Sequence, residues 1–263
     1  MIYRSYLTVS MLLLMILIFF SACGGTAQRT NTALPSKTTA PSLDPQIRVY
    51  TASVRVQERQ PTSVSASCKP GEQMIGGGFA ASDLFEYAAE VDSSYPSSPN
   101  TWTVAGSEVA SYFDLSAEVY CASAPIPLGA QIVQSSGGSV ACPQGTKVLS
   151  GGFQNHRGAS YPLANGWMTA DSEQVYALCA SQHLQSSMVV TSTFNVHSDS
   201  HGYQPGGGSA SCPAGSVATG GGFDSRGDVI VKNTLNVPPH AGWAVGAGGN
   251  ADVTVYALCG VLG

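Results

Sequence analysis

The 263-residue chain has little charge of either sign. Lys, Arg, Asp and Glu together make up 10% of its residues, whereas soluble proteins average about 25%. The 11 Lys and Arg residues are outnumbered by 16 Asp and Glu, so the net charge is −5 and no basic patch is expected to neutralise a phosphate backbone. We therefore expect no nucleic-acid partner. The 43% apolar content also argues against a largely disordered chain.

Common catalytic and metal-binding signatures are absent as well. The sequence contains no Gly-x-Ser-x-Gly, no His-Glu-x-x-His and no Cys-x-x-Cys, which are the patterns of hydrolases and zinc sites. Gly71 and Gly76 have the spacing of a phosphate-binding loop, but no Gly-Lys-Ser/Thr follows them. These absences favour a non-enzymatic protein without a cofactor.

Signals for helix are few. The only candidate is residues 83–91 (DLFEYAAEV). Elsewhere Gly, Ser, Thr, Val and Pro dominate, with frequent turn signals, which is typical of all-β proteins. Stretches at 47–56, 131–134 and 188–196 are β-rich. The apolar phase reverses within the first of these, which predicts a bulge near residues 52–53.

The N-terminal segment predicts export. Residues 11–20 form an apolar run that is too short to span a membrane and fits a signal peptide. The run ends in Phe20-Ser21-Ala22-Cys23, which resembles the lipobox of bacterial lipoproteins. This resemblance implies cleavage after residue 22 and lipidation of Cys23, with a membrane as partner. Ordinary secretion, with cleavage near residues 25–27, is the alternative.

Residues 23–45 are rich in Ser, Thr, Ala and Pro and contain almost no large apolar side chain. Such a composition cannot bury enough surface to fold by itself. We expect it to act as a tether.

The remainder repeats three times. Each unit has a Cys, a Gly three residues later and a Gly-Gly-Phe after a constant gap, then a Pro, a Trp and a closing Cys. The motifs begin at Cys68, Cys142 and Cys212 and close at Cys121, Cys179 and Cys259. The units span residues 46–123, 124–181 and 182–263. We expect them to form one domain: a β-prism with one sheet per repeat, with a β-trefoil or a row of small β-sandwiches as alternatives.

The cysteines fit an oxidising compartment. Apart from Cys23, six remain, an even number in an exported chain. Of the fifteen possible pairings, the repeat favours Cys68–Cys121, Cys142–Cys179 and Cys212–Cys259.

The recurring aromatic residues suggest both packing and binding. The Phe after each glycine pair is expected in the core, and the glycines allow a bulge or a close approach of neighbouring atoms. Trp102, Trp167 and Trp243 fit core packing. They also fit stacking on sugar rings, which three equivalent sites would make multivalent.

Other functional patterns occur in one unit only. His197, Asp199 and His201 alternate and would share one face of a strand, where they are weak candidates for a metal site. A solvated loop is the preferred interpretation, and no metal is expected. A group of acids could serve a glycosidase, although an exposed polar face of a short helix or loop is the preferred interpretation: Asp83, Glu86, Glu90 and Asp92. Residues 226–228 spell Arg-Gly-Asp, which a turn explains.

The whole unit, CPxGxxxxGGF followed by Pro, Trp and VYALC, resembles repeats of uncharacterised exported bacterial β proteins, as in actinobacteria and their relatives. The resemblance covers about residues 64–260. It implies an extracellular, disulfide-linked β domain and carries no functional residues with it. The sequence therefore predicts an envelope lipoprotein with a binding or adhesion role, with carbohydrate or a surface polymer as the possible ligand. A structural envelope protein and a secreted hydrolase are the alternatives.

Overall fold

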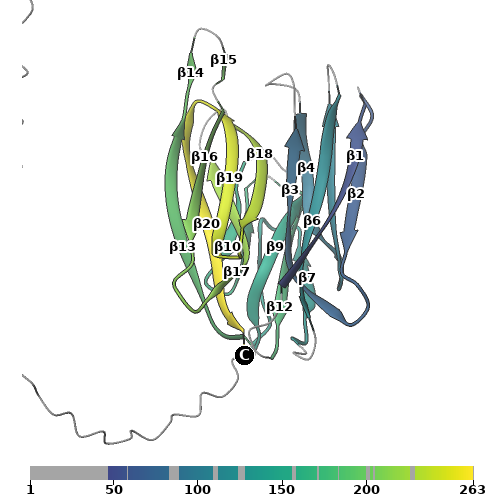
Figure 1. The fold of residues 1–263 in the computed structure, drawn as a ribbon, viewed down its shortest axis with the longest axis vertical. Coiled ribbons are helices and arrows are strands. Elements are labelled where there is room, and N and C mark those ends of the chain that lie inside the picture. The colour runs from purple at the N-terminus through teal and green to yellow at the C-terminus, as the bar shows by residue number, and fades with distance from the viewer. Residues whose placement is uncertain are drawn as a thin grey trace, which may run out of the picture. The chain divides into compact units, whose positions relative to one another are not determined.

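The chain is all-β. The computed structural model describes residues 47–57, 59–82, 89–108, 112–123, 128–155, 158–170, 172–182, 184–199, 202–203, 205–225 and 229–262. These residues form three six-stranded antiparallel sheets and one small hairpin (Figure 1). The hairpin consists of β14 (Ser198–Asp199) and β15 (Gly202–Tyr203).

The sheets, called A, B and C, have the following strand orders. Sheet A runs β1 (Ile47–Val56), β6 (Phe113–Ser123), β3 (Glu72–Ser82), β18 (Val229–Val237), β19 (Gly242–Gly249) and β16 (Pro205–Ser211). Sheet B runs β2 (Thr62–Ser67), β5 (Thr101–Glu108), β4 (Ala89–Ser98), β9 (Lys147–Gln154), β12 (Gln174–Ala180) and β7 (Gln131–Ser135). Sheet C runs β13 (Leu184–Val196), β20 (Ala251–Leu262), β17 (Val217–Ser225), β10 (Ser160–Leu163), β11 (Gly166–Thr169) and β8 (Ser139–Ala141).

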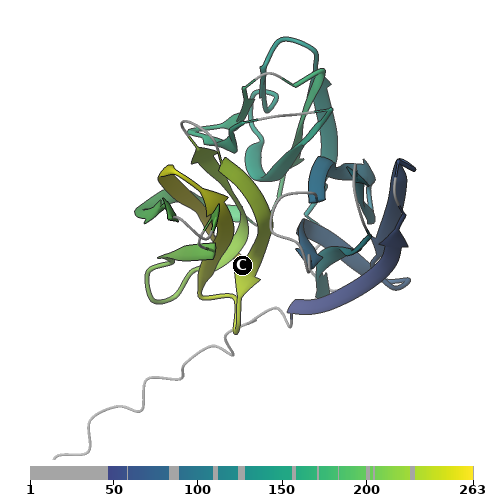
Figure 2. The ribbon, with the colours of Figure 1, turned by 90° about the horizontal axis from the view of Figure 1, so that it is seen from above.

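The three sheets form a β-prism with a threefold internal repeat. Seen from above, the three repeats form three lobes around a common centre (Figure 2). The expectation of one sheet per repeat is wrong, because every sheet takes three strands from each of two repeats. The first repeat places β1, β6 and β3 in sheet A but β2, β5 and β4 in sheet B. The repeats are thereby interlocked around the axis.

The Gly-Gly-Phe strands form the seams between repeats. Phe79, Phe153 and Phe223 are each opposite a residue of a neighbouring repeat. A Cβ on the glycine before each Phe would lie 2.2 Å or less from a carbonyl oxygen across the seam. Only glycine allows two backbones to approach so closely. The motif is therefore the joint between sheet halves.

The three phenylalanines meet inside the prism. Phe153 packs edge-to-face against Phe79 and against Phe223, with ring centroids 6.3 Å apart in both pairs. The void lined by the motif strands encloses about 10 Å³, which barely accommodates one water molecule. The interior is thus a packed core with no room for a ligand at its centre.

The disulfides pair as the repeat favours. The bonds are Cys68–Cys121, Cys142–Cys179 and Cys212–Cys259. Each joins the turn that follows β2, β8 or β16 to the last strand of the same repeat, and so links two sheets. The turns have equivalent glycines with φ between +81° and +85°, namely Gly71, Gly145 and Gly215.

Two local expectations are corrected. Residues 89–91 of the candidate helix belong to β4, because Val91 is buried in the sheet; the rest of that segment lies outside the described residues. β1 pairs with β6 in continuous register through residues 52–53. Each repeat instead has a register shift just before its Gly-Gly-Phe motif, as between Met74 and Gly76.

The prism has two distinct ends. β1, β7 and β13 begin at one end, here called the proximal end, and β6, β12 and β20 finish there. The three disulfides lie near it, since Cys121, Cys179 and Cys259 close those last strands. The distal end is the opposite one, where β1 ends at Val56.

Candidate functional site

The three tryptophans lie in the core. Their exposed fractions are 1% for Trp102, 1% for Trp167 and 0% for Trp243. A Cβ on the first glycine of the same repeat's Gly-Gly-Phe motif (Gly77, Gly151 or Gly221) would lie 2.2 to 2.3 Å from each indole ring. The candidate role in stacking on sugar rings is therefore wrong for these side chains, because no ring face reaches solvent.

The indole nitrogens are satisfied within each repeat. Trp102 donates a hydrogen bond to Ser94 Oγ and Trp167 donates one to Ser160 Oγ, both at 2.9 Å. Trp243 donates to Thr234 Oγ1. A buried indole requires such a partner. The repeated Trp is thus a structural pin that holds the strand from one sheet against the glycine strand of the next.

The histidine group is only partly described. His197 is exposed, Asp199 lies in β14, and His201 is outside the described residues. Within the described part of the chain, no three His, Cys, Asp or Glu side chains converge as metal ligands.

Only two of the four acids singled out in the first repeat lie among the described residues. Glu90 and Asp92 lie on β4, whereas Asp83 and Glu86 fall outside the described residues, as do residues 226–228.

One polar cluster lies at the proximal end of sheet A. Glu72 accepts hydrogen bonds from Arg48 Nη1 and the Tyr50 hydroxyl, both at 2.9 Å, and from the Lys69 amide at 3.0 Å. Burial of the carboxyl raises its pKa, but the Lys69, Tyr50 and Arg48 donors outweigh burial and leave the pKa of Glu72 below its ordinary value. All of the donors belong to the same repeat, so the cluster fastens β1 to the turn before β3.

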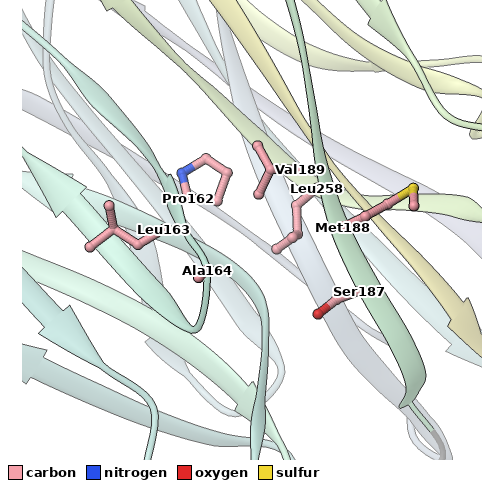
Figure 3. A pocket seen from close by; sticks show the side chains of 7 residues that line it. All are labelled: Pro162, Leu163, Ala164, Ser187, Met188, Val189 and Leu258. Atoms are coloured by element: carbon pink, nitrogen blue, oxygen red, sulfur yellow. The ribbon is translucent and has the colours of Figure 1, made fainter.

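An apolar depression lies on the outer face of sheet C. It has a volume of about 430 Å³, and Figure 3 shows its lining. The lining residues are Pro162, Leu163, Ala164, Ser187, Met188, Val189 and Leu258. They come from β10 and the turn after it, from β13 and from β20.

Large apolar side chains surround this depression. The exposed fractions are 52% for Met188, 37% for Val189, 37% for Leu163 and 36% for Met168. Leu163, Met168 and Val189 lie on the outer face of sheet C and are here called the apolar patch, whereas Met188 points to the other side of β13 (Figure 3). Soluble proteins usually expose large apolar side chains singly, so their grouping marks the candidate functional site.

The sheet register explains why they gather. Val189 is opposite Leu258, and Tyr256, two residues from Leu258 on the same face, stacks on Tyr161 with ring centroids 4.6 Å apart. Tyr161 is opposite Met168 and donates a hydrogen bond to its Sδ. One continuous outward row thus crosses the seam between repeats 2 and 3.

The sequence pattern did not predict this patch. Its residues are scattered over residues 163–189, and only the strand pairing brings them together. One signal was present: the row Met188-Val189-Val190 interrupts the polar–apolar alternation expected of a half-buried strand.

Comparison with known proteins gives no relative to guide this assignment. No protein-family model matches the chain, and no curated protein has a significantly similar sequence. Among the described residues there is no helix with the length and apolar character needed to cross a membrane.

Proposed function

We propose that the protein is an exported lipoprotein, anchored through Cys23, whose β-prism acts outside the cytoplasm as a non-enzymatic binding or adhesion module. The lipobox-like segment Phe20–Cys23 supports the anchor. The three disulfides are compatible with export, because such bonds persist in oxidising compartments. They also rigidify a domain whose sheets have polar outer faces.

The observation that carries the binding role is the hydroxyl-rich outer surface of the sheets. Cross-strand side-chain hydrogen bonds run over these faces, with few charges among them: Ser53–Ser116, Ser65–Thr103, Ser67–Thr101, Ser97–Thr103 and Thr193–Thr254. Such rows of hydroxyl groups present hydrogen-bond donors and acceptors to a ligand without carrying a net charge. A neutral, hydroxylated polymer such as a surface glycan is the ligand class that this chemistry favours. Because the core is closed, binding takes place on the exterior.

Two measurements test the proposal. Metabolic labelling with a fatty acid should mark the wild-type chain and leave Cys23→Ala unlabelled; an unlabelled wild type would exclude the anchor. An array of bacterial surface glycans, probed with the intact protein, should give binding that survives mild heating and is lost on reduction of the disulfides. The absence of any bound glycan would favour a structural envelope protein.

A further inference from the structure

β13 is an edge strand of sheet C and lies at the outer margin of the prism (Figure 1). It pairs with β20 on one side, and its other side has no partner strand among the described residues. Such an open row of backbone N–H and C=O groups can pair with a strand of another chain. β1 and β7 are the equivalent edge strands of sheets A and B, so the fold provides two internal references for this edge.

The two equivalent edges are protected, whereas β13 is not. β1 carries Arg48 and Arg55, and charged side chains hinder the pairing of an edge with a second strand. β7 has only five residues, and a short edge offers few backbone groups. β13 has 13 residues, with no charged residue and no proline among them. Opposite the closing cysteine, β1 has Arg48 and β7 has Gln131, but β13 has Met188.

Apolar side chains are exposed on both faces of this open edge. Met188 and Val189 are consecutive, so they point to opposite sides of the sheet, and their exposed fractions are 52% and 37%. A ligand that lay on one face would cover only one of them. A strand added beside β13 brings neighbouring side chains to both faces and covers both residues. The exposure therefore indicates a partner in the plane of sheet C.

The sequence of β13 is symmetric about Val189. In an antiparallel pair of two such strands centred on this residue, apolar residues face apolar ones and hydroxyl residues face hydroxyl ones. The facing pairs are Val189–Val189, Met188–Val190, Ser187–Thr191 and Ser186–Ser192. The register ends near Gln185, whose carbonyl already accepts a hydrogen bond from Lys147. β20 has no charged residue over residues 253–262, beside β13, so a twofold contact here opposes no like charges.

From these observations we propose that the open edge of β13 binds β13 of a second copy of the chain, antiparallel and centred on Val189. A twofold contact requires a self-complementary surface, and the symmetric sequence provides one. Backbone hydrogen bonds across the new seam join the two copies of sheet C into one continuous sheet, while the facing side chains set the register. Met188 of each copy is covered by Val190 of the other.

An antiparallel pair places the two points of chain entry at opposite ends, which suits adhesion between two surfaces. This step rests on the lipid anchor proposed above. β1 begins at the proximal end, so the segment that leads back to Cys23 joins the prism there. In the pair, the two proximal ends point in opposite directions. Copies anchored in facing membranes can therefore pair through β13, and the partner of the adhesion module is then a second copy of itself.

Cross-linking through single cysteines tests the register. Each mature chain carries Cys23→Ala, so the introduced residue is the only thiol outside the three disulfides. Under mild oxidation, Val189→Cys should form an intermolecular disulfide at least tenfold faster than Thr193→Cys, because the two residues at position 189 face each other about 5 Å apart. Thr193→Cys is the matched control. It is exposed on the same side of β13 but lies about 25 Å from its counterpart in this register.

A charge near the centre of the register should separate the two copies. Met188→Arg introduces the residue that β1 already has at the equivalent position, so the prism should fold as before. Because the charge would face Val190 of the second copy, we expect the dissociation constant measured by sedimentation equilibrium to rise at least tenfold. Asn195→Arg adds the same charge to β13 beyond the register and should leave the constant unchanged.

Vesicles test the adhesive step separately from the pairing. Vesicles that carry the lipidated wild type should aggregate, as turbidity measures, and vesicles that carry Met188→Arg should remain dispersed. If Cys23 carries no lipid, the proposed anchor fails and no vesicle acquires the protein, whereas the cross-link at position 189 still forms. If the lipidated protein dimerises but its vesicles stay dispersed, the pairing stands and the adhesive role is wrong.

Four outcomes would overturn the pairing itself. A wild-type chain that sediments as a monomer at every concentration has no such contact. Equal cross-linking at positions 189 and 193 shows that random collisions join the thiols. A dimer that Met188→Arg leaves intact uses another surface. A monomeric wild type that binds a synthetic peptide of alternating Val and Thr assigns the open edge to a strand of another protein.

Discussion

Each indole ring in the core is pressed against a glycine that tolerates no side chain. For Gly151, an added Cβ would lie 2.3 Å from the Trp167 ring and 2.5 Å from the Tyr176 carbonyl oxygen. Gly145 differs, because nothing lies within 4 Å of its added Cβ, but its φ is +81°. The two glycines of one repeat are thus required for different reasons.

These reasons predict different costs of substitution. Gly151→Ala should lower the free energy of unfolding by about 3 kcal/mol or more, because the ring and the backbone cannot both move aside. Gly145→Ala should cost about 1 kcal/mol, since only the left-handed backbone is strained. Denaturant unfolding of the oxidised proteins measures both. If the two substitutions lowered the free energy of unfolding equally, the Trp167 ring would have to be able to move away from the added methyl group.

Ser150 occupies a position that is glycine in the other two repeats. Its side chain is buried, its Oγ has no hydrogen-bond partner among the described residues, and Gly76 and Gly220 lie beside it. Ser160 is its matched control, since its Oγ accepts the Trp167 hydrogen bond.

We expect Ser150→Ala to leave stability unchanged or to raise it by about 1 kcal/mol, because it removes an unsatisfied polar group. Ser160→Ala should lower stability by about 1 to 2 kcal/mol, because it leaves a buried indole N–H unpaired. Thermal unfolding of the two variants, compared with wild type, provides the measurement. A loss in Ser150→Ala equal to that in Ser160→Ala would reveal a partner for Ser150.

At the scale of elements, Glu72 fastens β1 to the turn that precedes β3. Its pKa in the folded protein is lower than in the unfolded chain, so the unfolded chain binds more protons in acid. The stabilisation is therefore complete above the ordinary carboxyl pKa and is lost as the pH falls through the lowered value.

Glu72→Gln should accordingly reduce stability at neutral pH and leave it close to wild type in strong acid. Asp114→Asn is the control, because its ion pair with Arg55 spans 3.5 Å between two exposed side chains and such pairs contribute little. Urea unfolding at a series of pH values measures both differences. A Glu72→Gln difference that is the same at every pH would contradict the assigned ionic role.

At the scale of the whole molecule, the sharing of sheets makes the repeats interdependent. The third repeat has β13, β20 and β17 in sheet C, but β18, β19 and β16 in sheet A. Alone it has two half-sheets, each with an unpaired inner edge and an uncovered apolar face.

We therefore expect residues 182–263, expressed alone under oxidising conditions, to be unfolded as a monomer. Three copies associating about the axis would be able to rebuild the missing seams, so a folded species should sediment as a trimer. Analytical ultracentrifugation with nuclear magnetic resonance spectroscopy distinguishes these states. A folded monomer would contradict the interlocked arrangement.

Much of this architecture could be predicted from periodic patterns. The recurrence of Cys, Gly-Gly-Phe, Trp and Cys was sufficient for the threefold β-prism and for the disulfide pairing, because residues at equivalent places in a repeat occupy equivalent environments. Whether the three tryptophans lie in the core or at the surface could not be decided from the repeat, because the burial of an indole ring depends on which strand lies above it. The same limit applied to the helix expected at 83–91, where pairing in β4 overrides local propensity at residues 89–91.

The sequence by itself determined the fold class, the number of repeats and the cysteine partners, all of which depend on local composition and spacing. Tertiary structure alone decided that each sheet is shared between two repeats, that the tryptophans are pins of the core, and that Leu163, Met168 and Val189 share one outer face. These properties arise from pairing across the Gly-Gly-Phe seams. Such pairing joins residues far apart in the chain through backbone hydrogen bonds, which every residue type offers alike and which therefore leave little mark on the sequence.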